Sequence, residues 1–89
     1  KKFNKKIINI HPSLLPKYKG LNTHIKAIEN KDKFAGCTVH YVTEKLDSGK
    51  IIMQRKIKIT KKDTPITLSK KVLKQEHKLY PAAILKIFN

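Results

Sequence analysis

The 89-residue sequence has one cysteine, no tryptophan, three glycines and six acidic residues. Because Cys37 has no second cysteine to pair with, an internal disulfide and a C-x-x-C metal site are both excluded. The glycines at 20, 36 and 49 are too far apart to form a phosphate-binding loop. No apolar run approaches the ~18 residues that span a bilayer, and no secretory hydrophobic region is found. We therefore expect a cytoplasmic protein.

The scarcity of acidic residues leaves a formal net charge of +15, which ordinarily indicates a polyanion partner. However, Arg55 is the only arginine among 21 basic residues, and phosphate or base recognition favours the bidentate guanidinium. The aromatic residues are also not interleaved with the lysines as base-stacking platforms would be. We interpret the charge as a solvated surface. A small basic nucleic-acid-binding module, built on a degraded enzyme, is the alternative.

The hydrophobic pattern predicts an α/β chain. We expect a single segment, because 89 residues are too few for two domains. Residues 6–10 (KIINI) form a nearly continuous apolar run, which is typical of a strand buried on both faces of a parallel sheet. A loop is expected over residues 11–20, because Pro12, Pro16 and Gly20 prevent regular structure there. Pro81 should kink the last long helix or separate a final helix from it. The other expected elements are a helix at 22–30 capped by Asn22 or Thr23, strands at 37–43 and 51–59, a helix at 64–79 opened by Thr64 and Pro65, and a final helix at 82–88.

Three polar residues form the candidate catalytic site. Asn9 and His11 are two residues apart at the end of the first expected strand, so their side chains should face the same side. Asp47, between the two later strands, offers a carboxylate that could orient the His11 imidazole and favour its charged form. Asn9 offers an N–H donor to a carbonyl oxygen that becomes negative during acyl transfer. Taken singly, a histidine after a strand is more often a packing or capping residue, and an aspartate before Ser48 and Gly49 is by default a turn-former.

Residues 9–24 (NIHPSLLPKYKGLNTH) resemble the signature of the folate-dependent formyltransferases. The resemblance continues through residues 46–49 (LDSG) and 75–81 (QEHKLYP), and it covers essentially the whole chain in order. It implies the carboxyl-terminal part of a Rossmann-like formyltransferase fold, with a mixed sheet flanked by helices. Because the chain begins at Lys1, we expect residues 1–89 to be a fragment whose amino-terminal half is absent.

This resemblance implies transfer of a formyl group from 10-formyltetrahydrofolate, as cosubstrate, to the amine of glycinamide ribonucleotide in purine biosynthesis. Pro12 and residues 20–24 favour this nucleotide-directed branch over the hydrolases and tRNA formyltransferases of the family, although Asn22 stands where the family more commonly has His or Asp. The residues that match the family's functional positions are Asn9, His11 and Asp47 for catalysis, Glu76 for the nucleotide, and Thr43, Glu44, Leu46 and Asp47 for the folate.

The implied partners are these two small molecules, with no metal, nucleic acid or membrane. The family's amino-terminal half supplies a phosphate loop and a further wall of the folate pocket, so we expect the isolated segment to be inactive and marginally stable. Among the other candidate residues, we interpret His24 and His77 as structural and Cys37 as a small buried residue. We expect His40 to lie on a strand whose polar face borders the site.

Overall fold

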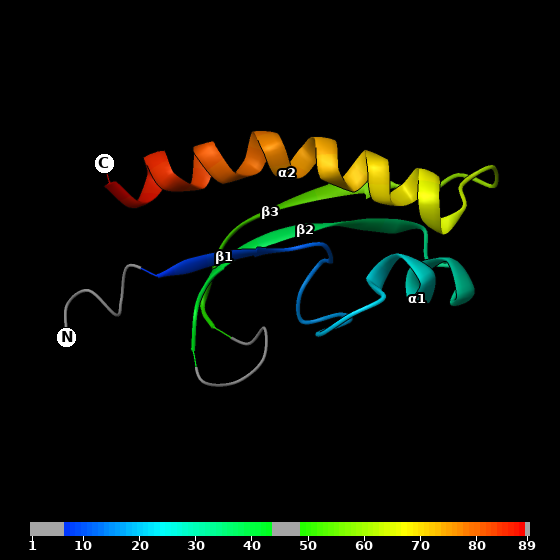
Figure 1. Cartoon of the computed structure of the whole chain (residues 1–89), viewed down its shortest axis with the longest axis horizontal. Coiled ribbons are helices and arrows are strands. Elements are labelled where there is room, and N and C mark those ends of the chain that lie inside the picture. The colour runs from blue at the N-terminus through cyan, green and yellow to red at the C-terminus, as the bar shows by residue number, and fades with distance from the viewer. Residues whose placement is uncertain (1–6, 44–48, 89) are drawn as a thin grey trace.

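The computed structural model describes residues 7–43 and 49–88, which form a three-stranded sheet and two helices (Figure 1). The α/β class predicted from the sequence is confirmed. Within the described ranges, no helix has both the length and the apolar character needed to cross a membrane. In chain order, the elements are β1 (Ile8–His11), α1 (Thr23–Glu29), β2 (Phe34–Tyr41), β3 (Ile51–Lys58) and α2 (Pro65–Phe88).

The sheet has the order β1-β2-β3, and both pairings between the described strands are antiparallel. The predicted burial of the first strand on both faces is wrong, because His11 is the only buried residue of β1. Helix α2 packs mainly on β2 and β3, and the edge of β1 that faces away from β2 carries no other described strand, so β1 is only partly covered. His11 itself belongs to β1, so the following loop starts at Pro12 rather than at His11.

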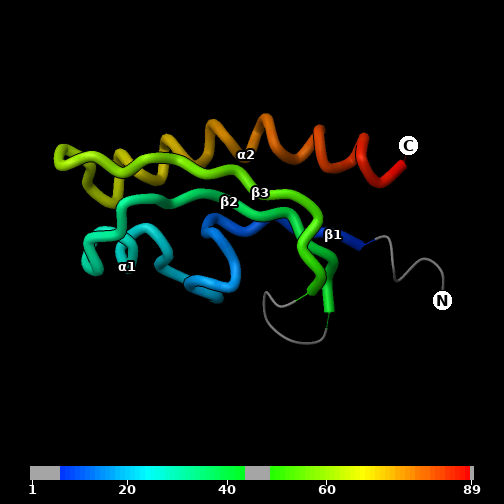
Figure 2. The backbone as a smooth tube through the Cα atoms, turned by 180° about the vertical axis from the view of Figure 1, so that it is seen from behind, coloured from blue at the N-terminus to red at the C-terminus, as the bar shows by residue number. Residues whose placement is uncertain are grey.

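The core lies between the sheet and α2, which runs along one side of the strands in both views (Figures 1 and 2). Alternate residues of β2 point to this side, while α2 contributes residues spaced by about one or two helical turns. The predicted burial of Cys37 is confirmed, with 0% of the residue exposed. The buried core residues are Ala27, Ala35, Cys37, Val39, Leu68, Val72, Leu79 and Ala83.

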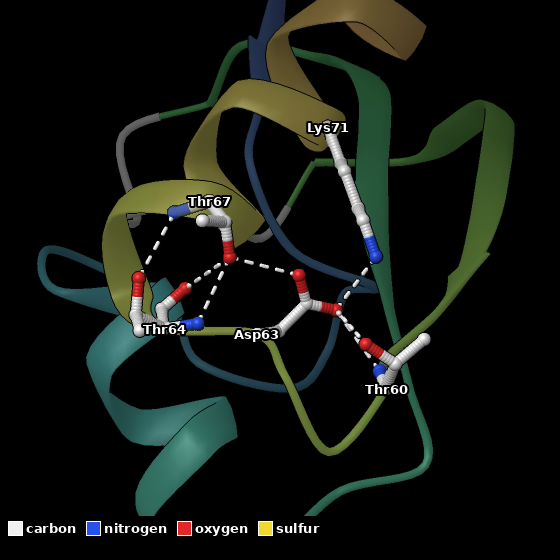
Figure 3. A network of polar contacts seen from close by, with 5 residues as sticks. All are labelled: Thr60, Asp63, Thr64, Thr67 and Lys71. Carbon is white, nitrogen blue, oxygen red and sulfur yellow. Dashed lines mark hydrogen bonds and ion pairs between the residues drawn. The ribbon is translucent and has the colours of Figure 1, made fainter.

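Helix α2 continues without interruption through Pro81, so the predicted separate final helix is wrong. Proline within a helix removes one backbone hydrogen bond, yet Leu79 and Ala83 on either side of it are buried in the core. Their burial keeps this part of the helix on the sheet. The predicted start is confirmed, since the Thr64 and Thr67 backbone N–H groups each donate to the other residue's hydroxyl, at 2.9 and 3.2 Å (Figure 3).

Helix α1 lies beyond the end of β1 and contacts both β2 and α2. Asn22 takes the N-cap position in a left-handed conformation, with φ of 61°, and its side chain makes no capping hydrogen bond. Thr23 does not cap the helix either, because its hydroxyl donates to the Pro12 carbonyl at 2.7 Å. The start of α1 is thereby attached to the loop that follows β1.

Candidate active site

Strand β1 places Asn9 and His11 on one face of the sheet, as the sequence predicts. Asn9 lies opposite His40 and His11 opposite Thr38 in the antiparallel register, so all four side chains share the face turned away from the apolar core. Asn9 is exposed, whereas His11 is 6% exposed. The strand therefore offers one accessible amide and one enclosed imidazole.

A carbonyl of the following loop holds the His11 imidazole. His11 Nε2 lies 2.8 Å from the Tyr18 carbonyl oxygen, which can only accept a hydrogen bond. Nε2 therefore carries the hydrogen and donates it. In the neutral ring, the lone pair then lies on Nδ1.

The loop from Pro12 to Tyr18 is held by its own polar contacts. The Ser13 hydroxyl donates to the Lys17 carbonyl at 2.6 Å, and the Tyr18 hydroxyl donates to the Asp32 carboxylate at 2.7 Å. Lys17 Nζ also lies 3.4 Å from Asp32. Tyr18, whose carbonyl binds His11, is thus held through its own side chain and through the backbone of Lys17.

Gly36 permits the close approach of this loop to β2. A Cβ atom at this position would lie 1.9 Å from the Arg55 carbonyl oxygen and 2.7 Å from Leu14 Cδ2. No real Cβ contact is this short, so neither β3 nor the loop could keep its place beside a larger residue.

A cavity of about 470 Å³ brings Asn9 together with Glu76, between β1 and α2. Its walls also include Leu73, His77 and Tyr80. Burial raises the pKa of the Glu76 carboxyl, and the positive charges of His77 and His11 partly oppose this effect. The sequence-predicted nucleotide residue therefore lies beside one predicted catalytic residue and within the electrostatic influence of another.

His11 lines a second cavity of about 430 Å³, formed by residues 20–25 and the first turns of α2. His24 also lines it, and burial lowers the pKa of the His24 imidazole. The exposed side chains of Leu21 and Ile66 form part of its apolar wall. His24 accordingly borders the His11 region as a predominantly neutral group at neutral pH.

The remaining predicted site residues fall in or beside the connection between β2 and β3. Asp47, Glu44 and Leu46 lie outside the described residues. Thr43 is described and exposed, two residues after the end of β2. At the other end of the connection, a Cβ atom on Gly49 would lie 1.6 Å from the Tyr41 carbonyl oxygen, so the motif's glycine is required by close backbone packing.

His40 is buried on the same face as Asn9, and its Nδ1–H donates to the Tyr41 carbonyl at 3.0 Å. His77 is exposed on α2. In the part of the chain that the structure describes, no group of three or more His, Cys, Asp or Glu side chains is arranged to hold a metal ion.

Sequence reasoning missed Tyr18 and Thr38, which contact the His11 region through backbone and hydroxyl groups. A carbonyl oxygen is present at every residue, so no residue type signals that Tyr18 holds the imidazole. Thr38 could have been noted from the alternation of β2, which predicts that Thr38 and His40 share a face.

The sequence profile described as formyl transferase matches residues 1–84. The human protein named trifunctional purine biosynthetic protein adenosine-3 is 49% identical over 83 residues, covering 93% of this chain and 8% of that protein. Phosphoribosylglycinamide formyltransferase of Escherichia coli (strain K12) is 47% identical over 79 residues, covering 89% of this chain and 37% of that protein.

Solved structures show the same relationship in three dimensions. The crystal structure of phosphoribosylglycinamide formyltransferase from Brucella melitensis matches with a TM-score of 0.90 and 49% identity, covering 97% of this chain and 44% of that chain. The protein from Anaplasma phagocytophilum matches with a TM-score of 0.89 and 47% identity, covering 93% of this chain and 41% of that chain. The chain thus spans less than half the length of the relatives it matches, and the fold class implied by the motif is confirmed.

Proposed function

The chain belongs to the formyl transferase family, and from this premise we propose that it takes part in moving a formyl group from 10-formyltetrahydrofolate to the amine of glycinamide ribonucleotide. The observation that carries the proposal is the placement of Asn9 and His11 on one face of β1, with Glu76 across an adjoining cavity. These are three of the positions that match the family's functional residues. The reaction belongs to purine biosynthesis.

The donors on this face suit acyl transfer. When bound, 10-formyltetrahydrofolate supplies the activated one-carbon unit. Asn9 presents an uncharged amide N–H where it can stabilise negative charge that develops on a carbonyl oxygen. His11, with Nε2 held by the Tyr18 carbonyl, uses Nδ1 to exchange a proton, and its imidazolium form adds positive charge to the same region.

Glu76 is assigned to the nucleotide substrate. Its carboxylate offers two acceptor oxygens to hydroxyl or amine groups, and its partial burial strengthens those hydrogen bonds relative to bulk water. Asp47 is assigned to orienting His11, and Thr43, Glu44 and Leu46 to the folate pocket, on the strength of the sequence motif. The proposed reaction uses no metal, nucleic acid or membrane.

We further propose that the 89-residue chain requires the family's amino-terminal region for activity. The outer edge of β1 is unpaired by any described strand, and α2 exposes Ile66, Leu73 and Tyr80 at seven-residue intervals along one face. Apolar groups so spaced form a continuous stripe that favours a covering partner. Without further binding contacts the reactants would lose positioning that can amount to roughly 7–11 kcal/mol of the barrier.

The test combines the 89-residue chain with the amino-terminal region of the Escherichia coli relative and follows formyl transfer at saturating concentrations of both substrates. We expect no turnover by the chain alone and turnover by the combination. His11→Ala should reduce kcat roughly 10²- to 10⁴-fold, because general acid–base assistance is lost. Lys58→Ala, at an exposed position on β3, is the control and should keep the activity of the combination.

Two results would contradict the proposal. Near-normal kcat in the His11→Ala combination would remove His11 from the mechanism. A well-folded combination that transfers no formyl group would instead identify the chain as an inactive remnant of the family.

A further inference from the structure

The hydroxyl of Thr38 uses its full hydrogen-bonding capacity beneath the loop that follows β1. It donates to the Ser13 carbonyl at 2.7 Å, and it accepts from the Leu15 backbone N–H at 3.1 Å and from Gln54 Nε2 at 2.9 Å. A hydroxyl has one hydrogen and two lone pairs, so no capacity is left. Thr38 is 0% exposed, so water cannot replace a lost partner without rearrangement.

Gln54 completes this arrangement from the neighbouring strand β3. Its side-chain amide nitrogen donates one hydrogen to Thr38 Oγ1 and the other to the Leu15 carbonyl, at 2.9 Å each. Thr38 and Gln54 are paired residues in the register of β2 and β3, so the sheet itself sets the separation of their side chains. Gln54 as a whole is exposed, although its side-chain amide is hydrogen-bonded.

We propose that Gln54 is a positioning residue for His11, acting through Thr38 and the loop from Pro12 to Tyr18. Thr38 and Gln54 bind the backbone of Ser13 and Leu15 on either side of Leu14. The Ser13 hydroxyl then donates to the Lys17 carbonyl, which directly precedes Tyr18. The Tyr18 carbonyl is the acceptor of the His11 Nε2–H bond, so a fixed loop backbone fixes the ring.

This inference rests on the proposed function of His11 in formyl transfer. A displacement of about 1 Å in a catalytic group can reduce turnover by about 10²-fold. His11 is attached to β1, whereas the atom that orients its ring is attached to a loop, and long-range contacts add to the loop's own hydrogen bonds in keeping the two in register. Thr38 and Gln54 supply such contacts to loop residues that precede them by 23 to 39 positions.

The test measures the ring and the loop directly by NMR in the 89-residue chain. The two variants are Gln54→Glu, which keeps the side-chain size and removes both N–H donors, and Thr38→Val, which replaces the hydroxyl by a methyl group. In each, the Leu15 amide should exchange with solvent about tenfold faster, since its anchor is lost or weakened. The imidazole ¹⁵N signals of His11 should move from a single Nε2–H form towards a mixture of the two tautomers.

Two further variants separate positioning from general stability. Thr38→Ser retains the hydroxyl and should restore both signals. Thr67→Val weakens the start of α2 without touching the loop. In this variant the His11 tautomer should be unchanged, and so should the Leu15 exchange rate once it is corrected for the change in global unfolding. Because Gln54 is exposed, Gln54→Glu should stay folded even if Thr38→Val does not.

Unchanged His11 and Leu15 signals in folded Gln54→Glu would overturn the inference. In the combined protein described above, Gln54→Glu should lower kcat about tenfold or more while KM stays within about twofold. If the NMR signals change but the unsubstituted combination transfers no formyl group, positioning stands as a property of the structure and the proposed function fails. The two claims are therefore tested separately.

Discussion

Asp63 shows how strongly one side chain can be held at the start of a helix. Its carboxylate accepts hydrogen bonds from the Thr60 backbone N–H at 2.9 Å, the Thr67 hydroxyl at 2.8 Å and Lys71 Nζ at 2.6 Å (Figure 3). Its side chain is 4% exposed. The contact with Lys71, followed by the Thr60 and Thr67 hydrogen bonds, holds the pKa of the Asp63 carboxyl well below its usual range.

We predict that Asp63→Asn lowers the urea midpoint of unfolding at neutral pH and that the difference from the unsubstituted chain shrinks as the pH falls below about 4. A depressed pKa in the folded state stabilises the fold fully above the ordinary aspartate pKa of about 3.9. That contribution falls as the pH drops from about 4 through the lower pKa of the folded state. Unfolding curves from pH 7 to pH 2 provide the measurement, and Glu29→Gln on an exposed face of α1 is the control. A pH-independent difference would contradict the assigned role.

Burial determines the reactivity of the Cys37 thiol. Burial, with a further contribution from the negative charge of Glu76, raises the pKa of Cys37 to about 11. We predict that iodoacetamide at pH 8 labels the folded chain only as fast as the chain opens, because both the thiolate and access to it are scarce. Mass spectrometry follows the adduct, and the urea-unfolded chain provides the fast reference. Labelling of the folded chain at the unfolded rate would show that Cys37 is accessible.

Among the elements, α2 tolerates an internal proline because its burial on both sides of Pro81 outweighs one missing hydrogen bond. We predict that Pro81→Ala stabilises the chain by roughly 1–3 kcal/mol, since alanine restores a backbone donor within the helix. The matched control is Pro65→Ala at the first helical position, where the N–H has no intrahelical acceptor and the change should be small. Urea unfolding of both variants measures the difference. Equal effects at the two positions would mean that helix hydrogen bonding does not limit stability here.

The loop after β1 and the strands beneath it act as one unit at the level of elements. Gly36 allows the loop to lie against β2, while Thr38 and Gln54 supply the polar contacts. The loop is therefore not a free surface segment, although its prolines and glycine predict irregular backbone. Its conformation depends on residues that follow it in the chain.

The whole molecule is thin and elongated, with principal extents of 45 × 25 × 16 Å. A body about 16 Å across in one direction has room for a single layer of core residues between the sheet and α2. Large apolar residues consequently remain exposed, including Leu21 at 82%, Ile66 at 68% and Phe88 at 67%. This shape is consistent with the proposal that a further region of the family's fold covers β1 and α2.

The net charge of +15 also acts on the scale of the whole molecule. We predict weak binding to short RNA and DNA, with affinity falling at least tenfold between 50 and 200 mM salt, because scattered lysines interact mainly with phosphates. Fluorescence anisotropy with labelled oligonucleotides of different sequence is the measurement. Sequence-selective binding that persists at physiological salt would instead support the basic nucleic-acid-binding module.

The sequence by itself determined the family through its motifs, and it also determined the type of each element and the shared face of Asn9 and His11. The element types and the shared face depend on local rules, since side chains in a strand alternate with a period of two and capping residues act within one helical turn. The burial of Cys37 and the start of α2 at Pro65 follow from the same rules. The motif also indicated Glu76, which the fold brings to the cavity beside Asn9.

Only the tertiary structure decided how β1 pairs, whether α2 continues past Pro81 and which atom holds the His11 ring. Each depends on free energy gained between distant parts of the chain. The Thr38 hydroxyl meets Ser13 across 25 residues, and the Gln54 amide meets Leu15 across 39. Local patterns carry no record of such partners, because a backbone carbonyl or an exposed glutamine looks the same in sequence whether or not the fold brings a donor or acceptor to it.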